Sequence, residues 1–418
     1  MALAVTAAVI LCTVLSAQSQ RRDAYAASRD HPAIQYSTAP VSDPVARLNE
    51  GLRDGKATLA FDSGTGYLAS VLRSFNIPIE SQALVFSPTS FQSDRINMRN
   101  PRAVFFSDTV AVGWVRGGSV LEVAALDPHQ GVIFYALDQK STSTPQFARN
   151  DMCLSCHLSW DTLGVPGLMT TSMYPLPDDP NAYANGFTTV QGSPLEQRWG
   201  GWWVTGSPGG ARHMGNVPVM PADAKKKPNV PPGDLKSLDG LFDLSGYPTP
   251  YSDLVAQLVL AHQTRMTNLI TRVGWEARLA AAVQSADAAS RVREAAADLV
   301  DYMLFVDEAP LTRPVSGTSG FAERFARNGP RDSKGRSLRD LDLQRRLVRY
   351  PCSYMIYTDA FDELPQNARD AVYARLIQVL AGRDQAPRYK ALSPADRRAV
   401  IDILRETKKG LPAAFASL

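Results

Sequence analysis

The hydrophobic residues of this 418-residue chain follow two different periods, and the change between them divides the chain into two parts. Between residues 57 and 139 the apolar runs are short and alternate with polar positions, which is typical of strands that bury one face. Beyond residue 251 the apolar positions recur every three or four residues, which is typical of amphipathic helices. The pattern predicts an α+β fold with a β-rich antiparallel N-terminal part and a predominantly α-helical C-terminal part.

Short segments rich in Gly, Asp and Pro separate the expected strands. This is turn chemistry, and it makes an antiparallel meander the simplest topology. The strands are expected at residues 103–106, 110–115, 119–126 and 132–137.

A capping pattern supports the helical interpretation of the second part. Ser393 is a favourable N-cap, Pro394 suits the first helical position, and Asp396 places a carboxylate in the first turn. The helices are expected at residues 253–271, 276–286, 289–305, 337–347, 363–380 and 393–407.

The chain opens on a stretch that is typical of an export signal. Residues 2–17 are uncharged and mostly apolar, and a polar, basic segment follows them. Small residues at Ala17 and Ser19 suit signal peptidase, so residues 1–19 are expected to be a signal peptide. A buried helix and an uncleaved anchor are the alternatives, but the run is shorter than the ~20 residues of a membrane span. We therefore expect a periplasmic or otherwise extracytoplasmic protein, with membrane association only if the segment stays uncleaved.

The rest of the chain divides by composition. A polar segment with three prolines precedes the strands, and a segment rich in Lys and Pro precedes the helices. The expected divisions are an N-terminal extension at 20–56, a β-rich region at 57–219, a Pro-rich linker at 220–250 and a helical domain at 251–418.

Composition and charge narrow the class of protein. Charged residues make up 20% of the chain and hydrophobic residues 44%, which is ordinary for a globular protein. The net charge is only +3, from 44 basic and 41 acidic residues. This balance gives no electrostatic signal for nucleic acid, so no nucleic-acid partner is expected.

The strongest chemical signal is the segment Cys153-Leu154-Ser155-Cys156-His157. Two thiols three positions apart on one helical turn can add to the two vinyl groups at one edge of a porphyrin. The adjacent imidazole then falls beneath the iron. This CxxCH spacing is a known signal for attachment of c-type haem.

On these residues the chain resembles c-type cytochromes, and the resemblance is confined to Cys153–His157. It implies one covalent haem c per chain, with thioethers from Cys153 and Cys156 and with His157 as the proximal iron ligand. It further implies one-electron exchange with a redox donor or acceptor protein. The small all-helical cytochromes carry this motif near the start of the domain, whereas here it follows strands in the middle of the chain.

Other uses of the cysteine pair remain open. A CxxC pair also forms disulfides and redox centres, and a zinc site uses such a pair with two further ligands. Either use would give a zinc- or disulfide-stabilised secreted binding protein. If haem takes the pair, Cys352 is the spare thiol of the exported chain, and its apolar surroundings favour a buried, inert side chain.

The sequence offers two histidines as the distal iron ligand. His213 lies in a Gly-rich loop beside Arg212, which would contact a haem propionate. His262 lies on the apolar stripe of an expected helix, where a histidine is more often a satisfied core residue. We expect one of the two to ligate the iron, with His213 ahead.

A length far beyond that of a small electron carrier favours a second hypothesis. If the sixth iron position is open, the haem could support peroxidase-like or other small-molecule redox chemistry. Arg212 and His213 would then act as distal acid and base groups. The electron carrier is the preferred interpretation, and no catalytic residue is assigned.

Overall fold

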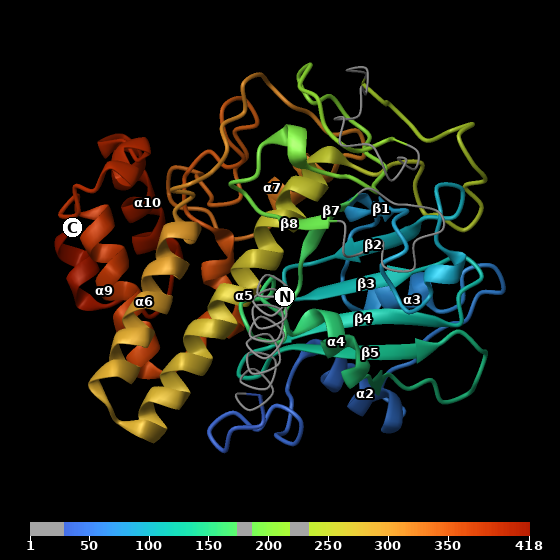
Figure 1. The fold of residues 1–418 in the computed structure, drawn as a ribbon, viewed down its shortest axis with the longest axis horizontal. Helices are drawn as coiled ribbons and strands as arrows, with labels where there is room; N and C mark the ends of the chain where they lie inside the picture. Colours follow the sequence, from blue (N-terminus) through green and yellow to red (C-terminus); the bar gives the residue numbers. More distant parts are fainter. Residues whose placement is uncertain (1–28, 174–185, 218–233) are drawn as a thin grey trace, which may run out of the picture.

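The computed structural model describes residues 29–173, 186–217 and 234–418 (Figure 1). A six-stranded antiparallel sheet lies in the first half of the chain and helices dominate the second half, which confirms the α+β fold class. The expected signal peptide at 1–19 lies outside the described residues. So do residues 20–28 of the expected extension and residues 220–233 of the expected linker.

The large sheet is a meander in which each strand pairs with the next strand of the chain. The four expected strands are present, and two short strands that were not expected complete the edges. The turn between β4 and β5 is tight because Gly131 adopts a positive φ of 88°. The strands are β1 (Ala83–Val85), β2 (Arg102–Phe106), β3 (Val110–Trp114), β4 (Val120–Asp127), β5 (Gly131–Asp138) and β6 (Ala148–Arg149).

The two faces of this sheet differ in chemistry. One face is mostly apolar, with Asp127, Tyr135 and Arg149 as its polar members, and packs on helices α2 (Pro44–Arg53) and α3 (Leu68–Ser74). We call the opposite face the motif face, because its Phe134 contacts the ring of His157. The strand register places a charged pair on it, Arg102 and Glu122, together with small residues (Ala111, Gly113, Ala124 and Ala136) and larger apolar ones (Val104, Phe106, Leu126, Val132 and Phe134).

The described part of the expected N-terminal extension packs on the sheet. The Tyr36 hydroxyl donates to the Val132 carbonyl at 2.7 Å. Buried Asp43 caps α2 and also accepts a hydrogen bond from the Tyr135 hydroxyl at 2.6 Å. Residues 29–56 are therefore part of the sheet layer.

The helical part is organised by α5 (Leu254–Val283), which lies between the sheet and the other long helices (Figure 1). Two separate helices were expected here, but one helix runs through Gly274, where the missing side chain lets Leu364 pack closely. No helix in the described ranges is long and apolar enough to cross a membrane. The remaining elements are α6 (Ala286–Met303), α7 (Phe321–Arg327), α8 (Asp359–Asp362), α9 (Gln366–Leu380), α10 (Pro394–Thr407) and a hairpin of β7 (Thr170–Met173) with β8 (Gly186–Thr189).

The helix expected at 337–347 is wrong, because this segment folds back on itself. The Asp342 carboxylate accepts hydrogen bonds from the amides of Gln344 and Arg345, which forms a local turn. Leu343 takes a positive φ of 55° at that turn. The apolar spacing was correct for burying Leu338 and Leu347, but a side chain that competes for backbone donors interrupted the helix.

The start of α5 is fixed by the fully buried carboxylate of Asp253. One oxygen caps the helix by accepting from the amides of Val255 and Ala256. The other accepts from the amides of Thr318 and Ser319 and from the Ser319 hydroxyl. Asp253 thus joins the helix to a distant loop.

Replacing Asp253 with Ala should lower the free energy of unfolding by about 4 kcal/mol, because five donors lose a buried charged acceptor. Urea unfolding followed by circular dichroism measures the loss. The matched control is Ser285→Ala, which removes the exposed cap of α6 and should cost only about 1 kcal/mol. Equal losses for the two variants would contradict the assigned role of Asp253.

Candidate functional site

The CxxCH motif folds as one short helical segment directly after the edge strand β6. A 3-10 turn at Asp151–Cys153 continues into α4 (Leu154–His157). Asn150 starts the segment, since its side chain accepts from the Met152 amide and its own amide donates to the Phe134 carbonyl. Residues three apart on such a turn project to the same side.

Both cysteines of the motif are free thiols, with Cys153 half-buried and Cys156 exposed. Burial raises the pKa of Cys153 to about 11, and the nearby Glu122 carboxylate adds to this effect. Cys153 is therefore a neutral thiol at pH 7. Catalytic redox pairs and thiolate metal ligands need the opposite shift, so the surroundings disfavour those uses.

The ring of His157 is held in one orientation. It packs on Phe134 with ring centroids 4.8 Å apart, and its Nδ1 lies 2.8 Å from the Gly167 carbonyl oxygen. A carbonyl can only accept, so Nδ1 carries the proton and Nε2 carries the lone pair. Nε2 makes no hydrogen bond to any residue in the described ranges. His157 is thus arranged to bind a metal through Nε2, in the way typical of histidine ligands.

The carbonyl that orients His157 is itself fixed by helix α5. The buried side chain of Asn268 accepts from the Leu168 amide at 2.9 Å and donates to the Leu168 carbonyl at 2.7 Å. Position 167 must be Gly, because a Cβ there would lie 2.2 Å from Asn268 Oδ1. The Gly167 amide closes the loop by donating to the His157 carbonyl at 2.9 Å.

An ion pair lies on the motif face beside the motif. Arg102 Nη1 is 2.8 Å from Glu122 Oε2, and Glu122 also accepts from Ser90 and Gln92. Burial lowers the pKa of His157; Arg102 lowers it further, while the Gly167 carbonyl and Glu122 oppose the shift. The pair is therefore close enough to set the electrostatic potential at the motif.

The structure places His213 in a buried loop beside Trp199, whose ring meets it edge-on at 5.4 Å. Its Nδ1 accepts from the Gly215 amide at 3.0 Å. Within the described residues Nε2 has no hydrogen-bond partner. Burial lowers the pKa of His213 to about 4, so the ring is neutral at pH 7. The neighbouring Arg212 is exposed.

His262 is fully buried, and both ring nitrogens are already bonded. Nδ1 donates to Gln191 Oε1 and Nε2 accepts from the Ser353 hydroxyl, each at 2.8 Å. Its ring stacks on Phe305 and Tyr302 at 4.4 and 5.4 Å. These contacts are those of a satisfied core histidine.

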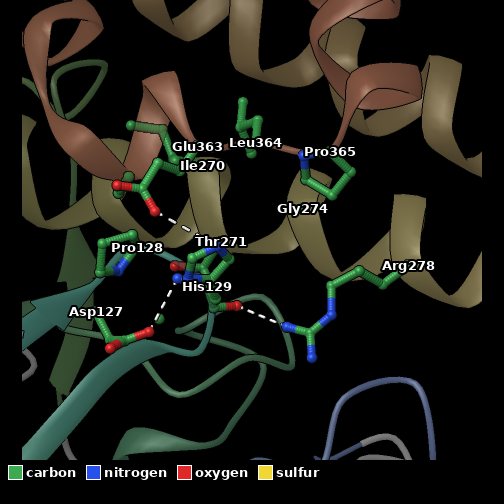
Figure 2. Close-up of a pocket in the computed structure, with 12 residues that line it drawn as sticks. Asp127, Pro128, His129, Ile270, Thr271, Gly274, Arg278, Glu363, Leu364 and Pro365 are labelled. Atoms are coloured by element: carbon green, nitrogen blue, oxygen red, sulfur yellow. Dashed lines mark hydrogen bonds and ion pairs between the residues drawn. The ribbon is translucent and has the colours of Figure 1, made fainter. Parts of the chain in front are cut away.

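A small pocket at the junction of the β4–β5 turn, α5 and the loop before α9 has its polar groups paired within the protein (Figure 2). Arg278 donates to the carbonyls of Ala33, Ile34 and His129. His129 Nε2 lies 3.4 Å from Glu363. The pocket lies where the two halves of the fold meet. The guanidinium group of Arg278 uses its hydrogen bonds to hold these halves together.

Within 29–173, 186–217 and 234–418, no three His, Cys, Asp or Glu side chains group closely enough to hold a metal ion. A zinc site takes three or four such ligands, whereas haem iron takes only one or two from the protein. No known family model, curated protein or solved structure matches the chain. The function is therefore argued from the motif and its surroundings.

Sequence reasoning missed four residues that build this site. Gly167 and Asn268 orient His157, and Arg102 with Glu122 forms the charged pair. The only available signal was the presence of Arg102 and Glu122 within otherwise apolar strands. No local pattern connects Asn268 to a loop one hundred residues earlier.

The pKa of His262, lowered by burial to about 3, makes stability depend on pH. The unfolded state binds a proton near pH 6.5 and the folded state does not, so stability falls as the pH drops below 6.5. Between pH 6.5 and 4.5 the wild type should lose roughly 2 kcal/mol more than His262→Gln in urea unfolding. His129→Gln, at an exposed position, should keep the wild-type slope. An unchanged slope in His262→Gln would contradict the assignment.

Proposed function

We propose that the protein is an extracytoplasmic monohaem c-type cytochrome that carries out one-electron transfer. The observation that supports this best is the hydrogen bond from His157 Nδ1 to the Gly167 carbonyl, next to two free thiols on the same turn. It leaves Nε2 of His157 with its lone pair, as an axial iron ligand requires.

The residues present fit a covalent haem. Cys153 and Cys156 would form the thioethers and His157 would bind the iron. The motif face beside them carries three small residues, Ala111, Gly113 and Ala136, and the Arg102–Glu122 pair lies over Gly113. When bound, the haem supplies a one-electron redox couple.

The chain's own residues hold the iron ligand in place. Asn268 fixes the loop whose carbonyl keeps the proton on His157 Nδ1. On the solvent side, Met152 is 68% exposed and Trp160 is 62% exposed, next to exposed Cys156. An exposed apolar rim at the attachment point suits contact with a redox donor or acceptor protein.

We assign the distal position to His213 in preference to His262. His213 is neutral and its Nε2 is uncommitted within the described residues, whereas both nitrogens of His262 are bonded. With its pKa lowered to about 4, His213 is a poor base at pH 7, and Arg212 is exposed, so the peroxidase-like alternative is not favoured.

Haem staining on a denaturing gel tests the proposal in a host with c-type maturation machinery. The wild type should retain haem on the gel, and Cys153→Ala/Cys156→Ala should lose it because both thioethers are gone. Cys352→Ala is the control for loss of a thiol, since Cys352 is buried and outside the motif, and it should stain like the wild type. A wild type without covalent haem contradicts the proposal.

The distal assignment predicts that His213→Ala changes the absorption spectrum of the haem protein and opens the iron to cyanide. His129→Ala removes an exposed histidine and should change neither property. Absorption spectroscopy with a cyanide titration measures both. If His213→Ala keeps the wild-type spectrum and cyanide affinity, His213 is not a ligand.

A further inference from the structure

One buried polar atom on the motif face has no partner. Nε of Arg102 is shielded from solvent and makes no hydrogen bond within the described residues. Buried donors in native proteins are nearly always satisfied, and leaving one unpaired costs about 1–3 kcal/mol. Such an atom indicates a missing acceptor.

The hydrogen bonds of Arg102 show which acceptor would fit. Nη1 is bound to Glu122 Oε2 at 2.8 Å. Nη1 lies on the Cδ side of a guanidinium group, so Nε and Nη2 form the edge that receives a carboxylate through two parallel hydrogen bonds. Among the described residues, neither of these two nitrogens has a hydrogen-bond partner.

The fold holds this guanidinium group in place. Arg102 and Glu122 lie against Gly113, where an added Cβ would be 3.6 Å from Arg102 Cδ and 3.3 Å from Glu122 Oε2. Ser90 and Gln92 bind the other Glu122 oxygen, so Glu122 stays paired to Arg102. The open edge is thus presented on the same sheet face as Phe134, which contacts His157.

We infer that Arg102, positioned by Glu122, binds a propionate of the haem; this rests on the proposed cytochrome function. A haem held by the motif would carry two propionates, and each is a carboxylate of the kind that this edge accepts. Arg212 was the expected propionate contact, but it is exposed, whereas Arg102 has the buried, unpaired donor. Arg102 is therefore the propionate-binding residue.

The reduction potential of the holoprotein tests this inference. A positive charge at the haem favours the reduced iron, so Arg102→Gln should lower the midpoint potential and Glu122→Gln should raise it. We expect each to change the reduction equilibrium constant about three- to tenfold, where tenfold equals about 59 mV for one electron. Arg102→Lys keeps the charge and should recover most of the potential.

The matched control is Arg116→Gln. Arg116 also pairs with a carboxylate at 2.8 Å, and its side chain is 26% exposed against 21% for Arg102. The reduction potential of the Arg116→Gln holoprotein should equal that of the wild type. The inference is overturned if Arg102→Gln and Glu122→Gln shift the potential in the same direction, or by no more than Arg116→Gln. Thermal unfolding of the variants distinguishes a direct effect on the haem from a purely structural role. A purely structural role would lower Tm and leave the reduction potential unchanged.

The two proposals fail in different ways. A wild type without covalent haem overturns the cytochrome function, and the inference about Arg102 with it. A wild type that carries haem, combined with variants whose potentials match the control, overturns only the role of Arg102.

Discussion

The candidate site depends on the burial of α5 between the sheet and the helices. Because this helix is covered on nearly every side along most of its length, Asn268 can present its amide to the Leu168 backbone at a fixed place. The adjacent Gly167 carbonyl then fixes the proton of His157. The sequence did not indicate a role for the large helical part. In the structure its helix α5 holds the loop that orients His157.

The sheet supplies the second constraint on the site. Strand alternation makes one face mostly apolar for packing on α2 and α3, and leaves the other to carry a charged pair among small and apolar residues. Such a face would be costly to bury without polar partners. Arg102 and Glu122 satisfy part of each other's hydrogen-bonding capacity. The unpaired edge of the Arg102 guanidinium is the part of the sheet that we propose binds the haem.

The features that were predictable from the sequence are those with local causes. The meander followed from period-two runs and turn residues, and the capping box of α10 from Ser393 and Asp396. The segment 337–347 was mistaken for a helix because hydrophobic spacing does not show that the Asp342 side chain bonds the following amides. The motif could be recognised in the sequence. The residues that orient its histidine could not, because Phe134 and Gly167 contact His157, and Asn268 holds the Gly167 loop, without any local sequence pattern that links them. The sequence placed His213 ahead of His262, but it could not show that both ring nitrogens of His262 are hydrogen-bonded whereas Nε2 of His213 has no partner among the described residues.

The central claim is that the CxxCH turn holds one covalent haem through its two cysteines, with His157 as iron ligand. A pyridine haemochrome spectrum of the purified wild type, with haem and protein quantified together, tests it most directly. The account predicts a c-type α band and one haem per chain. A colourless protein, or a haem that is extracted by acid acetone, would contradict it.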